Sequence, residues 1–484
     1  MRWSLLVLLL LAATFAVGQE SGPPVSQEGD LRADFRREGE RIRDACKTFN
    51  FSSGMECAIL FFTDHPLHIA VGSIAPQNGF GVGGAFVTEK NTTNWRLSWD
   101  VDAVVSNNVS WRAGGYMKMI HTPKENIRVI RPVVSKPGET PGTAPAKKPR
   151  INLVHPYSVF NLYAQSTSLN RLNFFGPDND STVSGKSVFG MTETIVGANV
   201  IKPVFEWSAI SKLNLALLGE ANGRFVNIRG NHGESAPSIE TVYTDAQAPG
   251  LSSQPGFVQL GEGVRIKPVL GDYLQLNYLV KFQQFFAPSS SQNSFLRWTV
   301  DLNHTFFLYG YTQSAPKSTD GNGPDECGPL TEKCPPVSHS RNLNGSIGAR
   351  LLLSESMTSG TSAVPFYFQP TLGGGDLNGA PSLSSYQDYR FRAPNILLLQ
   401  EKFEHSIWGP LGFTFMADQG RVAVTRGDIG FSHLKHSFGT GLTLRAGGFP
   451  MVFLIFAWGG NEGNHTIFNM NTSLLGGSSR PTLF

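Results

Sequence analysis

Long segments of alternating apolar and polar residues constrain the fold of this chain more than any other feature. In Leu274–Gln283 and Leu296–Phe306 the alternation continues for about ten residues, and Trp95–Asp102 places Trp, Leu, Trp and Val on one face. A period of two is typical of a strand with one apolar and one wet face. Strands of soluble proteins usually run about five or six residues, whereas a tilted strand that crosses a bilayer needs roughly nine to eleven. The polar faces carry Arg, Lys and Asp, which suit a watery lumen better than a dry core.

Similar segments recur along most of the sequence. We therefore predict an all-β fold, a transmembrane antiparallel β-barrel of about sixteen strands, because even strand numbers are the rule for single-chain bacterial barrels. A secreted soluble β-sandwich is the alternative, since its strands alternate too. The further candidate strands are 79–90, 107–119, 152–168, 183–199, 211–221, 257–267, 342–354, 364–372, 396–405, 411–420, 435–446, 450–459 and 464–474. The irregular inserts at 120–150, 222–256 and 312–341 are expected to be surface loops.

The amino-terminal residues predict export. Arg2 precedes an apolar run from Leu5 to Val17, and the pattern is that of a secretory signal peptide, which we assign to residues 1–18. After it, no window approaches the ~20 apolar residues of a transmembrane helix. We assign 19–70 to a helical, disulfide-bonded segment and 71–484 to the barrel. The helix is expected over Leu31–Phe49, either as a plug or cap of the barrel or as a solvated helix with no such role.

The four cysteines fall in two close pairs. In an oxidising compartment this spacing predicts two local disulfides, Cys46–Cys57 and Cys327–Cys334. A zinc site is the alternative, but the pairs lack C-x-x-C spacing and clustered His partners.

Charge and motifs give no sign of catalysis. The 40 Lys and Arg residues nearly balance the 37 Asp and Glu residues, so we expect no nucleic-acid partner. Gly79–Gly84 matches G-x-G-x-x-G, but no helix is expected after it, and neither G-x-S-x-G nor H-E-x-x-H occurs. We predict no catalytic residues, no cofactor and no metal site, and therefore no enzyme.

A glycine-rich segment, Thr371–Ala380, reads TLGGGDLNGA and is followed by five candidate strands. Two of these strands supply an acid each, Glu401 and Asp418, and a later one contains Phe-Gly-Thr-Gly-Leu at 438–442. In these features the C-terminal third resembles the outer-membrane insertion-porin superfamily, the BamA and TamA type of bacterial surface antigen. There a Gly-Gly element and a (Val/Leu)-Arg-Gly-(Phe/Tyr) motif precede five strands.

The resemblance implies a loop that folds back into the lumen, where the motif Arg pairs with the two acids. Here Asn378 replaces that Arg and Ala380 replaces the closing aromatic residue. An amide can form hydrogen bonds but cannot neutralise Glu401 and Asp418. We therefore predict that Arg390 or Arg392 takes the anchoring role. The loop motif itself comprises Gly373, Gly374, Asn378 and Gly379.

Family members that insert or secrete proteins carry POTRA domains before the barrel, and the residues before Gly79 lack the βααββ pattern of such a domain. We expect a monomeric barrel in the bacterial outer membrane, surrounded by lipid, with periplasmic or outer-membrane protein partners. Its expected role is a pore or a reduced component of protein translocation or assembly. A structural surface-antigen barrel without transport is the alternative.

Overall fold

The computed structural model describes residues 40, 43, 67–121, 157–207, 213–231, 233–270, 274–315, 339–408, 411–446 and 449–470. The chain divides into two compact units, Met1–His65 and Pro66–Phe484. In the first unit, Glu40 and Arg43 are described, and both are helical. The signal segment and all four cysteines, hence both predicted disulfides, lie outside the described residues.

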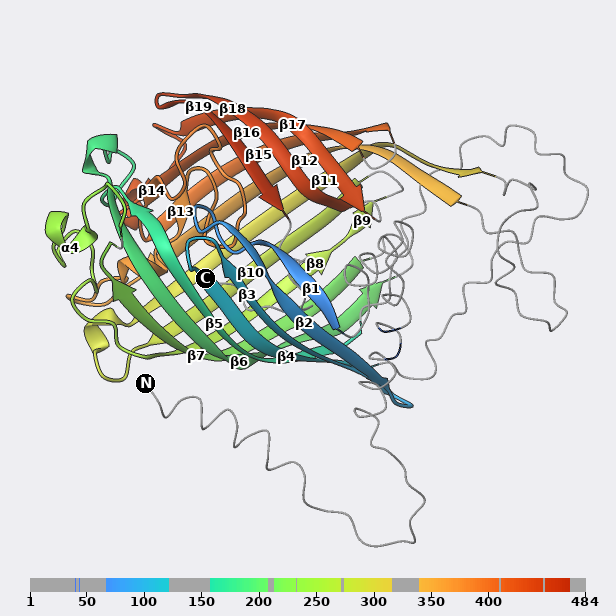
Figure 1. The fold of residues 1–484 in the computed structure, drawn as a ribbon, viewed down its shortest axis with the longest axis horizontal. Coiled ribbons are helices and arrows are strands. Elements are labelled where there is room, and N and C mark those ends of the chain that lie inside the picture. The colour runs from blue at the N-terminus through green and yellow to red at the C-terminus, as the bar shows by residue number, and fades with distance from the viewer. Residues whose placement is uncertain are drawn as a thin grey trace, which may run out of the picture. The chain divides into compact units, whose positions relative to one another are not determined.

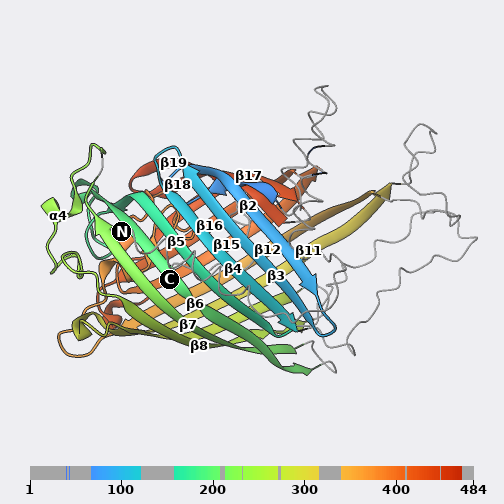
Figure 2. The ribbon, with the colours of Figure 1, turned by 60° about the horizontal axis from the view of Figure 1, so that its bottom comes forward.

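The second unit is built on an antiparallel meander in which each long strand pairs with the next along the chain (Figures 1 and 2). Its sixteen described strands are β1 (Leu67–Ser73), β2 (Phe80–Asn91), β3 (Trp95–Ser106), β4 (Trp111–His121), β5 (Val159–Phe174), β6 (Ser187–Trp207), β7 (Leu213–Arg229), β8 (Phe257–Lys267), β10 (Leu274–Phe286), β11 (Phe295–Ala315), β12 (His339–Met357), β15 (Asn395–Trp408), β16 (Leu411–Ala423), β17 (Lys435–Ala446), β18 (Phe449–Gly460) and β19 (Gly463–Met470).

Short elements complete the described part of the unit. They are β9 (Val269–Leu270), which pairs with β10, the two-stranded β13 (Thr371–Leu372) and β14 (Phe391–Arg392), the helix α4 (Ile239–Val242), and the 3-10 turns η2 (Val183–Gly185), η3 (Ser291–Asn293), η4 (Phe366–Phe368) and η5 (Arg426–Asp428). No helix among the described residues is long and apolar enough to cross a membrane.

The meander curls into a barrel. Its first and last strands, β1 and β19, come within 8 Å of each other, measured between Cα atoms. Every other pair of neighbouring strands has a backbone register, but none joins β1 to β19 among the described residues. We call this boundary the seam. A single continuous meander replaces the two stacked sheets of the alternative β-sandwich.

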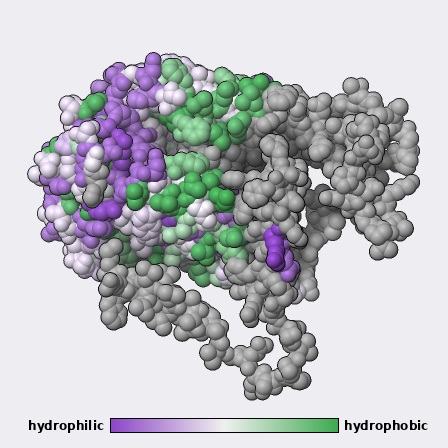
Figure 3. All heavy atoms as spheres, viewed as in Figure 1, coloured by the Kyte–Doolittle hydropathy of each residue, from purple (hydrophilic) through white to green (hydrophobic). Residues whose placement is uncertain are grey.

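The alternation read from the sequence separates the two faces of the wall. On β3, Asp100 and Asp102 are buried inside the barrel, whereas Val101 and Val105 point outward with 59% and 52% of their surface exposed. The other strands repeat the pattern, so exposed apolar side chains collect on the outside, over the strands (Figure 3). A polar inside and an apolar outside are the reverse of a soluble barrel.

Three boundary predictions were wrong, and the first two compensate in the strand count. The segment 364–372 is not a wall strand, because η4 turns within it and its aromatic rings are buried inside the barrel. The wall instead gains β1, which no candidate strand covered and which starts at Leu67, so that four of its seven residues, 67–70, lie in the segment predicted to precede the barrel. The loop predicted from 222 begins only after Arg229, because β7 continues to that residue.

Candidate functional site: a loop inside the barrel

The connection between β12 and β15, residues 358–394, folds back into the barrel, and we call it the lumenal loop. Its turn η4 presents three buried aromatic rings to the opposite wall. The Phe366 ring lies 5.5 Å from Phe174 of β5 and 5.1 Å from Phe189 of β6, between ring centroids. Phe368 contacts Phe257 of β8 in an edge-to-face arrangement at 4.9 Å. The loop therefore spans the lumen and packs against strands distant in sequence.

A buried cation fixes the same turn from β11. Arg297 Nη2 donates to the Phe368 carbonyl oxygen at 2.7 Å, and its Nε donates to Ser356 Oγ at 3.1 Å. The guanidinium also lies over the Phe285 and Phe295 rings, 5.6 and 5.2 Å from their centroids. Contacts of this kind compensate a buried cation for lost hydration.

Next to this turn, the lumen holds an ion-pair network on β6, β7, β8 and β10. Arg224 Nη1 binds Glu193 Oε1 at 2.8 Å, with both side chains almost fully buried. Glu220 accepts hydrogen bonds from Gln259 and Gln283 at 2.7 and 2.8 Å and pairs with a lysine of β10. Paired charges satisfy one another where water is largely excluded. The Arg224 guanidinium also lies over the Phe368 ring of the loop, 5.9 Å from its centroid.

The Gly-Gly element forms a tight turn inside the loop. Gly373 and Gly374 have φ of 105° and 62°, and a Cβ atom on Gly374 would lie only 2.7 Å from the Asp388 backbone. Gly375 N–H donates to Asp388 Oδ1 at 2.8 Å, and Tyr389 N–H donates to the Gly373 carbonyl at 3.0 Å. Glycine is needed here both for the left-handed backbone and for the close approach.

The tip that contains Asn378 and Gly379 makes a local turn. Asp376 Oδ1 accepts the N–H groups of Asn378 and Ala380 at 2.9 and 2.8 Å, and the Asn378 side chain is exposed. Gly379 has a φ of 79°, which suits such a turn. A cavity of 270 Å³ remains between this tip and the wall, lined in part by Ala380 and Arg350.

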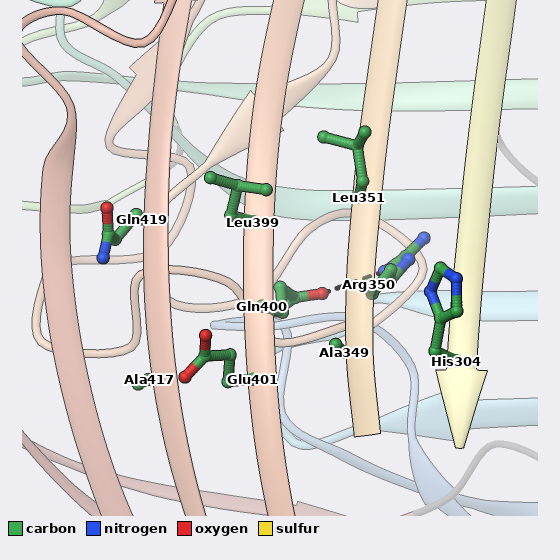
Figure 4. Close-up of a pocket in the computed structure, with 9 residues that line it drawn as sticks. All are labelled: His304, Ala349, Arg350, Leu351, Leu399, Gln400, Glu401, Ala417 and Gln419. Carbon is green, nitrogen blue, oxygen red and sulfur yellow. Dashed lines mark hydrogen bonds between the residues drawn. The ribbon is translucent and has the colours of Figure 1, made fainter. Parts of the chain in front are cut away.

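The two predicted anchor acids have different environments. Asp418 of β16 is buried and accepts the Leu383 N–H at 2.9 Å, so it does hold the lumenal loop, through the backbone. It also accepts a hydrogen bond from Gln400 of β15 at 3.2 Å, since the register pairs these two residues. Because side chains alternate along a strand, Glu401 then faces outward, where it is exposed beside Ala417 (Figure 4). The prediction that Glu401 anchors the loop is therefore wrong.

The two predicted cations are both buried, but neither pairs with Glu401 or Asp418. Arg390 Nε binds Glu462 Oε1 at 2.6 Å, and its other nitrogens donate to the side chain and carbonyl of Ser181 at 2.7 Å. Arg392 Nη1 donates to the Phe366 carbonyl at 2.8 Å, within the loop itself. Arg390 therefore joins the loop to Glu462 and Ser181 rather than to either of the expected acids.

The lumenal loop contacts both sides of the seam through consecutive residues. Tyr389 Oη donates to the Pro76 carbonyl, in the turn between β1 and β2, at 2.9 Å. Arg390 binds Glu462, in the turn between β18 and β19. We call Tyr389 and Arg390 the clasp. Sequence reasoning missed Tyr389 and Glu462; an acid within the Gly-Gly-Asn-Glu-Gly turn at 459–463 was the available signal.

Burial raises the pKa of Asp376 to about 6, even though the N–H groups of Ala380 and Asn378 lower it. An acid whose pKa is higher in the folded protein contributes stability at low pH and loses it as the pH rises. We therefore expect the wild-type barrel to become less stable as the pH rises from about 4 to about 6. The contribution of Asp376 to this loss should be absent in the Asp376→Asn variant. The temperature at which the heat-modifiable gel shift occurs, measured for both proteins at both ends of this pH range, tests the prediction. Equal pH responses of the two proteins would contradict the prediction.

No protein-family model matches the sequence, and no curated protein matches it. Among solved structures, CdiB from Acinetobacter baumannii matches with 11% identity and a TM-score of 0.43, over 83% of this chain and 58% of that one. CdiB from Escherichia coli matches with 10% identity and a TM-score of 0.44, over 82% and 59%. BamA from Haemophilus ducreyi lacking POTRA domains 1–3 matches with 9% identity and a TM-score of 0.41, over 84% and 68%.

The chain thus spans less than three fifths of the length of either CdiB chain.

Proposed function

We propose that this protein is a bacterial outer-membrane barrel, and that it works as a gated pore or as a reduced component of protein translocation or assembly. The outer face supports the membrane location, because exposed Val, Leu, Phe and Trp side chains collect on the strands while charged side chains such as Asp100 and Arg224 are buried on the lumenal side. Lipid is the environment that such an inverted wall fits. Fractionation with the outer membrane and heat-modifiable migration on gels test this step, and a soluble monomer would contradict it.

The single observation that carries the gated role is the lumenal loop with its clasp. The loop crosses the lumen, packs on the opposite wall and contacts both sides of the seam. Side-chain contacts and a few isolated backbone hydrogen bonds, such as Asp178 N–H to the Arg392 carbonyl at 2.9 Å, join the loop to the rest of the barrel. A segment without a continuous backbone ladder to the wall is the kind of element that can be displaced. Proteins that act from either side of the membrane are the partners we propose, with the barrel itself monomeric.

A structural barrel without transport is the second candidate. The many buried contacts of the loop favour this second candidate. Arg297 of β11 and the loop's own Arg390 and Arg392 all hold the loop inside the barrel. Under this proposal the loop is a permanent part of the core.

Conductance separates the two candidates. Replacing residues 373–392 with a short Gly-Ser connection is expected to raise the single-channel conductance of the reconstituted barrel several-fold, because the shortened loop no longer fills the lumen. Replacing the exposed turn 425–430 in the same way is the control and should leave conductance unchanged. Wild-type and shortened barrels that both fail to conduct would favour the structural candidate.

A further inference from the structure

Glu401 is a charged residue on the outer wall, next to small and aromatic side chains. Its neighbours across β12 and β16 are Ala349 and Ala417, and the exposed rings of Phe415 and Phe438 lie close by in the same sheet. The Glu401 carboxylate makes no hydrogen bond or ion pair with the part of the chain that the structure describes. Figure 4 shows it extending along the wall from β15.

The two alanines make a depression around this carboxylate. A pocket of 190 Å³ lies there, and its lining also includes Leu351, Leu399 and Gln419. His304, at the far side, already shares a hydrogen bond of 2.8 Å with the Tyr278 hydroxyl. The lining also includes Arg350, whose guanidinium is already bound by Asp301 and Gln400. The depression therefore offers one acidic group, an amide and apolar side chains around them.

The position of Glu401 along its strand excludes lipid headgroups as its partner, on the proposal that the barrel spans a membrane. It lies six residues from Asn395 and seven from Trp408, the ends of β15. Six residues correspond to about 20 Å of strand, or about 14 Å of depth at the usual tilt, in an apolar band about 25 Å tall. Glu401 is thus near the middle of the band, where a charge without a partner is costly.

We propose that this depression, the Glu401 notch, is a docking site for a membrane-embedded segment of a partner protein that carries a lysine or arginine. The charge complements the carboxylate, and the long aliphatic stem of either side chain fits along the apolar rim. This inference rests on the membrane location proposed above, and it concerns the outside of the barrel, not the lumen.

The test uses the full chain, purified and inserted into phosphatidylcholine vesicles, with heat-modifiable migration as proof of insertion. The probe is a synthetic Leu-Ala helix with one central lysine and a dansyl label, and the comparison helix has leucine at that position. Energy transfer from the tryptophans of the barrel reports binding. We expect the lysine helix to bind at least tenfold more tightly, and Glu401→Gln to abolish that difference.

Glu262→Gln is the matched control, because Glu262 is also an exposed carboxylate on the outer wall, opposite Gly219 and Phe282. This variant should keep the tenfold preference. Equal binding of the two helices to an inserted barrel, or a preference that survives in Glu401→Gln, would overturn the docking site alone. Glu401-dependent self-association without any helix would identify a second copy as the occupant and overturn the stated partner. A barrel that does not insert would overturn the membrane proposal as well.

Discussion

Arg390→Leu is expected to lower the free energy of unfolding by about 3–5 kcal/mol, the usual cost of removing one partner of a buried ion pair. The change leaves Glu462, only 11% exposed, without its cation and removes both contacts to Ser181. Denaturant unfolding of the barrel in detergent micelles provides the measurement.

A double-mutant cycle makes this prediction specific. Arg390→Leu combined with Glu462→Leu should be less destabilised than Arg390→Leu alone, because no uncompensated charge remains. Arg426→Leu is the control, since its ion pair with Glu355 is exposed and should contribute no more than about 1 kcal/mol. Equal effects of Arg390→Leu and Arg426→Leu would show that the clasp does not hold the loop.

Phe366→Ala is expected to lower the free energy of unfolding by about 3–5 kcal/mol, because it removes a fully buried ring from the packing of the lumenal loop. The ring contacts Phe174 and Phe189, so its loss should also loosen the lumenal loop and increase cleavage of that loop by added protease.

Phe431→Ala provides the comparison for this change. The Phe431 side chain is 70% exposed in the connection between β16 and β17, so its truncation should have little effect on stability. A similar loss of stability in both variants would mean that Phe366 does not act through its lumenal packing.

The wall of the barrel could be predicted from the sequence because each long strand carries its own signal. Alternation over eight or more residues placed β3, β10 and β11, and it assigned the correct face to Asp100 and Arg297. β1 was not predicted, because its seven residues, including Gly72, are too few for the alternation to stand out. The aromatic run at 366–368 was taken for a strand because burial inside a lumen makes every position apolar, whichever face it occupies.

The interior of the site could be predicted only in part. The glycine-rich turn was evident, since few residues other than glycine adopt positive φ. The partners of the loop were not, because they depend on register: a shift of one residue decides whether Gln400 or Glu401 faces Asp418. Contacts such as Arg390 with Glu462 join segments 72 residues apart, and no local pattern records them.

The clasp makes the loop and the two edge hairpins mechanically interdependent. Pro76 and Glu462 belong to hairpins at opposite ends of the meander, yet they are held by neighbouring peptide units. A force that draws either hairpin away is transmitted through one backbone bond to the other. Loss of the Tyr389–Pro76 contact therefore weakens the Arg390–Glu462 contact, and the reverse also holds. The two edges of the wall then separate cooperatively rather than one after the other.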